Sequence, residues 1–304
     1  MPLTSPAIDL SDRARGCILA GAIGDAMGGP FEGRPGPLAF REPPVWLISD
    51  DSQLTLATCE SITEVGGVLP DQIAARFVAW FRDGRITGIG ASTLKALRDL
   101  DAGAHWALAG AKGEMSAGNG AAMRIAPLAF YLDPAVAQHR QLLRDVCRIT
   151  HHNEEAYAGA LAVQVAIRSL AYQLTSPDCL LASVVELLPD SRVRDRIAEL
   201  TRVADDLNIA HVAREYGSSG YVVESVPLAL CAAQLVAHSQ LDDILRQIIE
   251  GGGDTDTVTS MAGQMMGTWL GASQIPRNMI ESLTNAAEIE QIANEFAITV
   301  TTVA

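Results

Sequence analysis

Two short acidic segments place several oxygen-bearing side chains at expected helix starts. The first is SDDS at residues 49–52, and the second is GGGDTDT at residues 251–257. A helix start needs one side-chain acceptor for its free N–H groups, and acidic residues in the first turn suit the helix dipole. These needs explain one aspartate at each start, with Asp254 as the N-cap of the second helix. They do not explain the additional aspartate and hydroxyl residues at each start.

Metal binding is the alternative to helix capping at these segments. Adjacent carboxylates repel one another, so clustering them lowers stability unless a cation neutralises the charge. Mg²⁺ and Mn²⁺ bind carboxylate and hydroxyl oxygens, and two converging clusters would hold a pair of such ions about 3.5–4 Å apart. Because two clusters of the same type occur on well separated parts of the chain, the pattern favours metal binding.

Two glycine-rich segments, RITGIGAS (85–92) and GNG (118–120), are candidates for close approach of a ligand to the backbone. A glycine turn before a helix offers N–H donors to a phosphate or a ribose. Taken alone, GNG indicates only a turn. The His151-His152 pair has no third soft ligand nearby in the sequence, so a zinc site is not expected there.

The composition favours a helical protein that does not bind duplex nucleic acid. Of 304 residues, 48% are hydrophobic and only 5% are aromatic, so we expect a core made mainly of Ala, Leu, Ile and Val. The formal net charge is −14 and no run of Lys or Arg occurs, whereas a duplex-binding protein usually has a basic face. Five scattered cysteines without a CxxC pair predict free thiols in a reducing cytosol.

The chain pattern predicts one helical domain. No apolar segment is long enough to span a membrane, and the N-terminus has no signal-peptide core, so we expect a cytoplasmic protein. Small residues at Gly16, Ala20 and Gly24 would let a neighbouring helix approach the first helix closely. No linker or repeat divides the chain. We therefore predict an all-α fold over residues 1–304, with a poorly ordered lead over 1–10.

Six segments, in order along the chain, together resemble the ADP-ribosylglycohydrolase family, which includes arginine-directed and serine-directed ADP-ribosyl hydrolases. They are GAIGDAMGGPFEG (21–33), SDDSQLTLATCESI (49–62), GNGAAMRIAPLAF (118–130), THHNEEAYAGALAVQ (150–164), SSGYVVESVPLALCA (218–232) and GGDTDTVTSMAGQMMGTWLG (252–271). The resemblance implies a single compact orthogonal helical domain with a dinuclear metal cleft formed by loops and helix N-termini. It also implies two divalent cations, Mg²⁺ or Mn²⁺, that orient the ribose and activate water. The partner would be an ADP-ribosylated protein or a small ADP-ribosyl conjugate.

The resemblance assigns roles residue by residue. It implies a metal site formed by Ser49, Asp50, Asp51, Asp254, Asp256 and Thr257. Within that site, Asp50, Asp51 and Asp256 are counted as catalytic, with Asp256 bridging the two ions. Glu32, in the mobile GPFEG loop, is the acid/base candidate. Asp25 is interpreted as a structural residue that holds neighbouring loops. The residues expected along ADP-ribose are Gly88, Gly90, Ser116, Gly118, Asn119, Gly120, His151 and Tyr221.

The sequence leaves the linkage and the mechanism open. Arginine-directed members carry an acidic residue where this chain has Gly88, so arginine and serine linkages both remain, and Asp83 or Glu114 could supply the missing charge. Direct displacement and a ring-opened route are both compatible with these residues. Two alternatives to catalysis also remain: an inactive ADP-ribose-binding or structural relative, and an immunity protein that blocks an ADP-ribosylating toxin. Arg124 could be structural or contact a phosphate.

Overall fold

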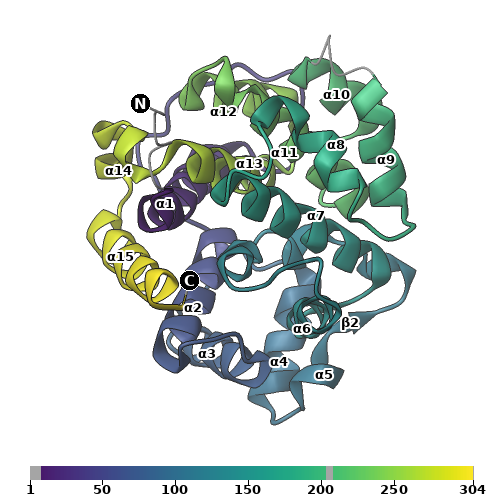
Figure 1. Cartoon of the computed structure of the whole chain (residues 1–304), viewed down its shortest axis with the longest axis vertical. Coiled ribbons are helices and arrows are strands. Elements are labelled where there is room, and N and C mark those ends of the chain that lie inside the picture. The colour runs from purple at the N-terminus through teal and green to yellow at the C-terminus, as the bar shows by residue number, and fades with distance from the viewer. Residues whose placement is uncertain (1–7, 203–207, 304) are drawn as a thin grey trace, which may run out of the picture.

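The computed structural model describes residues 8–202 and 208–303 and shows helices packed around one another (Figure 1). The α-helices are α1 (Leu10–Gly28), α2 (Asp50–Val65), α3 (Pro70–Arg82), α4 (Ala91–Asp101), α5 (Trp106–Ala109), α6 (Ala137–Arg148), α7 (Glu154–Ala171), α8 (Leu180–Val185), α9 (Arg192–Leu200), α10 (Ile209–Tyr216), α11 (Val222–Gln234), α12 (Leu241–Gly251), α13 (Thr255–Leu270), α14 (Arg277–Ser282) and α15 (Ala286–Val303). The 3-10 helices are η1 (Gly29–Phe31), η2 (Glu114–Ser116), η3 (Asn119–Ala121), η4 (Ala126–Phe130), η5 (Pro177–Cys179), η7 (Leu235–Ala237) and η8 (Ala272–Gln274). The two-residue strands are β1 (Arg34–Pro35), β2 (Ala111–Lys112), β3 (His151–His152) and β4 (Gly252–Gly253).

Helices α1 and α13 form the centre of the fold, and both are buried along most of their length. Their backbones touch because glycines face one another or face carbonyl groups. A Cβ atom on Gly24 would lie only 2.1 Å from the carbonyl oxygen of Thr259, and one on Gly16 only 2.2 Å from that of Gly267. The prediction that small residues on the first helix admit a close neighbour is confirmed.

Asp25 holds the start of α2 against α1. Its Oδ2 atom accepts hydrogen bonds from the backbone N–H groups of Ser49, over 3.0 Å, and Ser52, over 3.1 Å. The side chain is fully buried. A carboxylate from one helix therefore satisfies free N–H groups at the start of another, which confirms the interpretation that Asp25 holds neighbouring segments together.

A two-strand ladder ties the loop after α1 to the start of α13. Strand β1 pairs antiparallel with β4, with Arg34 opposite Gly253. The neighbouring Gly33 N–H also donates to the Gly253 carbonyl oxygen over 2.8 Å. The ladder brings the segment that contains Glu32 beside the segment that contains Asp254. These short strands were not predicted from the broken Gly/Pro pattern of residues 28–37.

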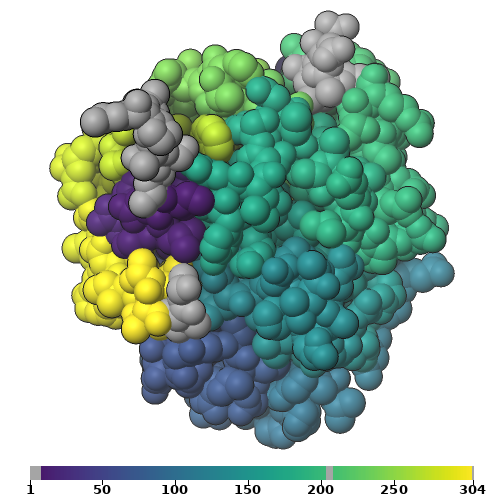
Figure 2. Space-filling model, viewed as in Figure 1, coloured from purple at the N-terminus to yellow at the C-terminus, as the bar shows by residue number. Residues whose placement is uncertain are grey.

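The predicted all-α single-domain fold is confirmed. Figure 2 shows the C-terminal segment beside the N-terminal helix on the surface, in agreement with the packing of α15 on α1. The expected lead over residues 1–10 falls mainly on residues 1–7, which lie outside the described residues; α1 begins at Leu10, with Asp9 as its N-cap. None of the described helices is both long enough and apolar enough to cross a membrane.

Candidate metal centre and ligand cleft

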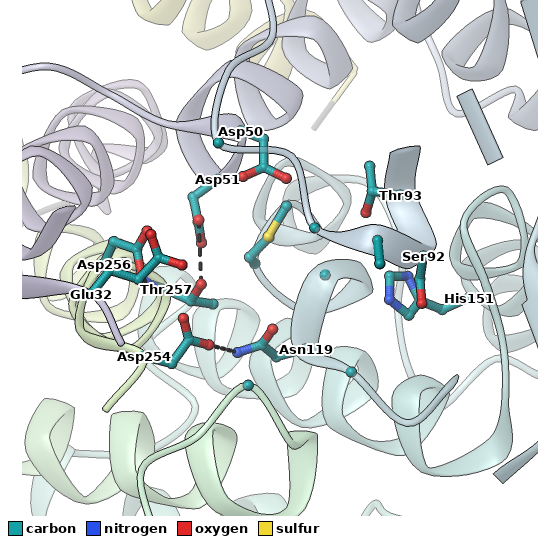
Figure 3. Close-up of a pocket in the computed structure, with 17 residues that line it drawn as sticks. Glu32, Asp50, Asp51, Ser92, Thr93, Asn119, His151, Asp254, Asp256 and Thr257 are labelled. Carbon is teal, nitrogen blue, oxygen red and sulfur yellow. Dashed lines mark hydrogen bonds between the residues drawn. The ribbon is translucent and has the colours of Figure 1, made fainter. Parts of the chain in front are cut away.

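A cleft of about 250 Å³ lies where the starts of α2, α4 and α13 meet η3 and the loop after α1 (Figure 3). Most of the predicted site residues line it: Glu32, Asp50, Asp51, Gly88, Gly90, Gly118, Asn119, Gly120, His151, Asp254, Asp256 and Thr257. They come from sequence positions as far apart as Glu32 and Thr257. The fold therefore gathers into one place side chains that the sequence shows only as separate motifs.

Two groups of three carboxylates meet at one shared residue. Asp25, Asp51 and Asp256 each offer a carboxylate oxygen within 4.8 Å of the others, and so do Glu32, Asp254 and Asp256. Asp256 therefore belongs to both groups. Such an arrangement provides two adjacent positions surrounded by oxygen atoms, with one carboxylate between them.

Two hydroxyl groups donate hydrogen bonds to the carboxylate of Asp51. Thr257 Oγ1 is 3.3 Å from Asp51 Oδ2 and donates to it, which joins the start of α13 to the start of α2 (Figure 3). Ser49 Oγ donates to the same oxygen over 3.1 Å. The other oxygen, Asp51 Oδ1, is buried and has no hydrogen-bond partner in the described part of the chain. A buried carboxylate oxygen without a donor is costly and fits a metal ligand.

Asp254 occupies the N-cap position of α13 but does not act as a side-chain cap. Its side chain makes no capping hydrogen bond to the helix. Instead, Asp254 Oδ2 accepts a hydrogen bond of 2.5 Å from Asn119 Nδ2, which fixes the carboxylate in the cleft (Figure 3). The Asp254 side chain therefore lies in the cleft. The explanation that it caps the helix does not hold for this side chain.

Asp50 belongs to neither of the two carboxylate groups. Its carboxylate lies beside the 88–90 loop, where the Gly90 N–H donates to it. A Cβ atom on Gly88 would lie 3.7 Å from Asp50 Oδ1. In Figure 3 the Asp50 carboxylate lies apart from the carboxylates of Asp256 and Glu32. Among the predicted metal ligands, Asp50 is therefore placed between the carboxylate groups and the glycine loop.

Burial raises the pKa of these aspartates. The pKa of Asp50 rises to about 8, from burial and then from the charge of Asp25, and that of Asp256 rises to about 9, from burial and then from the charge of Asp254. The pKa of Asp51 lies well above 3.8, because of burial and then the charge of Asp256. The pKa of Asp25 rises to about 6, mainly from burial. Carboxylates that repel one another in a buried place are the donor set that a divalent cation neutralises.

Glu32 lies at the exposed rim of the cleft, where η1 ends. Its pKa is raised, first by partial burial and then by the charge of Asp254, while a hydrogen bond with Asp256 opposes the shift. The β1–β4 ladder explains this position, because the chain turns into the ladder directly after Glu32. A carboxyl group at this rim reaches the carboxylate cluster and is also open to solvent.

A second region of the cleft carries donors rather than carboxylates. Helix α4 begins there, and its N-cap residue Gly90 makes no side-chain cap, so the first N–H groups of the helix are free for a ligand. The buried His151 ring faces this region. A Cβ atom on Gly120 would lie 2.7 Å from His151 Cε1, so the ring packs directly on this glycine.

Two residues predicted along ADP-ribose, Ser116 and Tyr221, are not part of the cleft lining, and neither is the predicted metal ligand Ser49. The Ser116 hydroxyl donates to the Lys112 carbonyl oxygen over 2.8 Å. Tyr221 is the N-cap residue of α11, its hydroxyl lies 3.4 Å from Arg192 Nη1, and its neighbour Gly220 lines the cleft instead. Neither the Ser116 nor the Tyr221 side chain lines the cleft, so their contact with ADP-ribose stays a prediction.

Sequence reasoning missed several residues that line the cleft: Ala91, Ser92, Thr93, Met123 and Gly220. Ser92 and Thr93 follow the GIG turn directly, so the start of a helix after a glycine loop was the available signal. Met123 follows GNG by three positions and looked like an ordinary core residue. No local pattern distinguishes such a methionine from the core.

The family model described as ADP-ribosylglycohydrolase matches residues 6–303. The chain therefore belongs to the ADP-ribosylglycohydrolase family, a family of ADP-ribosyl hydrolases, and the resemblance seen in the six segments is confirmed.

Relatives with stated activities match over nearly the whole chain. ADP-ribosylarginine hydrolase Tri1 of Pseudomonas putida is 27% identical, covering 94% of this chain and 78% of that protein. ADP-ribosylhydrolase ARH3 of Mus musculus is 25% identical, covering 93% of this chain and 90% of that protein. A solved structure described as an ADP-ribosylglycohydrolase-related protein complex matches with a TM-score of 0.75 and 25% identity, covering 96% of this chain and 99% of the other.

Proposed function

We propose that this protein is a metal-dependent hydrolase that releases ADP-ribose from a modified protein side chain or a small ADP-ribosyl conjugate. The observation that carries the proposal is the pair of carboxylate groups that share Asp256. A structural protein has no need for clustered, mutually repelling carboxylates in a buried cleft. Membership of a family of ADP-ribosyl hydrolases supports the same reading.

The donor set suits two divalent cations, Mg²⁺ or Mn²⁺. The residues that would hold them are Ser49, Asp50, Asp51, Asp254, Asp256 and Thr257, and the partnerless Asp51 Oδ1 atom supports this fit. When bound, such ions supply Lewis acidity that orients ribose hydroxyls and lowers the pKa of water. Asn119 and Thr257 hold the carboxylates Asp254 and Asp51 in place for this role.

Glu32 is the residue we expect to move the proton. Cleavage at the anomeric carbon needs a proton delivered to the leaving group or taken from water, and a carboxyl group with a raised pKa can do either at neutral pH. Glu32 is beside Asp256 and open to solvent, so it can exchange its proton after each turnover. The free N–H groups at the start of α4 and the His151 ring would bind the diphosphate and sugar oxygens.

The linkage is set by what lies around the leaving group. Gly88 lines the cleft without an acidic side chain, and the possible substitutes Asp83 and Glu114 are exposed and outside the cleft lining. The missing carboxylate favours an uncharged, serine-type linkage, with the arginine linkage as the competing case.

A substrate panel tests the proposal. Arginine-linked, serine-linked, O-acetyl and nucleic-acid-linked ADP-ribose are each incubated with the protein and Mg²⁺ or Mn²⁺, and free ADP-ribose is measured. We expect metal-dependent release from the serine-linked substrate, and none from a variant with Asp254→Ala and Asp256→Ala. Metal-dependent binding of ADP-ribose without release from any substrate would indicate an inactive relative. Tight binding of an ADP-ribosylating toxin that survives metal removal would indicate an immunity protein.

A further inference from the structure

Arg124 is a buried cation to which the proposed reaction assigns no role. It is fully buried beside the cleft residue Met123, and its guanidinium carbon lies 4.9 Å from the centre of the Phe77 ring. In the described part of the chain, its Nε and Nη1 atoms have no hydrogen-bond partner. Burying a charge with incomplete hydrogen bonding is costly, so stability is a poor explanation for this arginine.

Two hydrogen bonds connect Arg124 to the cleft. Arg124 Nη2 donates to Thr150 Oγ1 over 2.7 Å, and Thr150 Oγ1 lies 2.9 Å from His151 Nδ1. Thr150 is fully buried, as is nearly all of His151. The other ring nitrogen, His151 Nε2, is on the cleft side: a Cβ atom on Gly118 or on Gly120 would lie 3.3 Å from it (Figure 3).

The direction of these hydrogen bonds determines where the His151 proton is. Arginine only donates, so Thr150 Oγ1 accepts the first bond. The hydroxyl has a single hydrogen, and His151 Nδ1 is the acceptor that the described residues offer it. With a proton on Nδ1 instead, the hydroxyl hydrogen would be buried without a partner.

A doubly protonated ring is disfavoured as well. Burial, followed by the positive charge of Arg124, lowers the pKa of His151 to about 3, so the ring carries one proton at neutral pH. Burial lowers the pKa of Arg124 only to about 10, so the guanidinium remains a charged donor there.

We propose that Arg124 is a positioning residue: through the Thr150 hydroxyl it holds His151 in the tautomer with its proton on Nε2, so that the ring offers an N–H donor to a ligand oxygen in the cleft. The use of that donor for ADP-ribose rests on the proposed function. The tautomer itself does not, because it follows from contacts within the chain.

Nitrogen-15 NMR of histidine side chains in the full-length, ligand-free protein tests the tautomer, with the His151 signals assigned through the His151→Gln variant. We expect the proton on Nε2 in the wild type and a mixture of tautomers in Thr150→Val, which keeps the side-chain shape but removes the hydroxyl. Thr150→Ser should restore the wild-type tautomer. Thr268→Val is the matched control, because it removes a buried hydroxyl that donates to the Gln264 carbonyl within α13.

Arg124→Met gives a second route to the same readout. Without the guanidinium, the Thr150 oxygen loses its incoming donor and the hydroxyl is free to rotate, so accepting a hydrogen bond from Nδ1 is no longer disfavoured. We therefore expect a tautomer mixture as in Thr150→Val. A merely structural arginine would change the unfolding temperature and leave the His151 tautomer as it is.

Titration with ADP-ribose in the presence of Mn²⁺ tests the use of the donor. We expect Thr150→Val to weaken binding about two- to fivefold, because only the fraction of molecules with the proton on Nε2 keeps the hydrogen bond. Thr150→Ser and Thr268→Val should bind like the wild type. A proton on Nδ1 of wild-type His151, or an unchanged tautomer in Thr150→Val, would overturn the proposal. The expected tautomer in a protein that binds no ADP-ribose would support the positioning role and reject the proposed function.

Discussion

Thr257 and Asp51 are 206 positions apart in the chain, yet Thr257 Oγ1 donates to Asp51 Oδ2 over 3.3 Å. This contact joins the start of α13 to the start of α2 and brings the two acidic segments face to face. Asp256, next to Thr257, then completes both carboxylate groups. The proposed pair of cations between these helix starts would offset their mutual repulsion.

Loss of the shared carboxylate should remove metal-dependent ligand binding. Asp256→Asn keeps the size of the side chain but takes the negative charge from both carboxylate groups at once. We expect the affinity for Mn²⁺ to fall at least about tenfold, with a parallel loss of Mn²⁺-dependent ADP-ribose binding, as measured by calorimetry. The control is Asp243→Asn, which removes an exposed carboxylate from the first turn of α12. Equal metal affinity in the two variants would contradict the two-metal assignment.

The same variant should be more stable than the wild type when metal is absent. Because the pKa of Asp256 is raised from 3.8 to about 9, the folded protein binds this proton more tightly than the unfolded chain does. The stabilisation of the folded state by this proton is fully present below about pH 4. It is lost progressively as the pH rises toward 9, because the unfolded chain releases the proton whereas the folded protein must keep it. Asp256→Asn does not need this proton, so in EDTA at pH 8 we expect its free energy of unfolding to exceed that of the wild type by at least about 1 kcal/mol.

Thermal unfolding at several pH values measures this effect. The difference between Asp256→Asn and the wild type should be small well below pH 4, where the aspartate is protonated in both the folded and the unfolded state, and should grow through pH 8. Added Mn²⁺ should stabilise only the wild type, and more strongly at higher pH, because the metal binds the deprotonated carboxylate. A wild type that gains metal-free stability relative to the variant as the pH rises would contradict the raised pKa.

Glu32→Gln should reduce turnover more than binding. The amide can still hydrogen-bond at the rim of the cleft but cannot transfer a proton, so we expect kcat to fall roughly 10²–10³-fold while the Kd for ADP-ribose changes only a few fold. Glu42→Gln changes an exposed glutamate in the same long loop and serves as the control. If Kd rises as much as kcat falls, Glu32 acts as a metal or ligand contact rather than as the acid/base residue.

Gly120→Ala should weaken ligand binding without unfolding the protein. The added methyl group would be 2.7 Å from His151 Cε1 and 3.3 Å from Thr93 Oγ1, so the imidazole ring must move. We expect ADP-ribose affinity to fall about tenfold or more, because a shifted ring loses its donor position. Gly67→Ala is the matched control, since a Cβ atom there has open space around it. Unchanged affinity in Gly120→Ala would show that His151 does not contact the ligand.

Gly24→Ala should destabilise the fold itself. Its Cβ atom would lie 2.1 Å from the Thr259 carbonyl oxygen, and backbone atoms of α13 cannot move aside as a side chain can. Overpacking of this kind costs roughly 1–3 kcal/mol or more, which urea denaturation would measure as a lower midpoint. Gly67→Ala is again the reference. A midpoint equal to that of the reference would mean that α1 and α13 can separate freely.

The helical class and the positions of the acidic segments could be predicted from local patterns. Helix periodicity, the scarcity of aromatic residues and the oxygen-rich starts at Asp50 and Asp254 are all properties of neighbouring residues. The six family segments added expected roles for Glu32 and His151, and both residues line the cleft. Small residues on the first helix likewise predicted its close contact with another helix.

Other features depended on contacts between distant parts of the chain. Asp254 looks like a helix cap from its neighbours, but its side chain binds Asn119 because the fold brings η3 beside α13. Asp50 and Asp51 are adjacent in sequence, yet successive helical residues point in different directions, so only Asp51 joins a carboxylate group. The connection of Arg124 through Thr150 to His151 is invisible in the sequence for the same reason. Sequence order specifies which groups exist, whereas the packing of helices specifies which of them share a cleft.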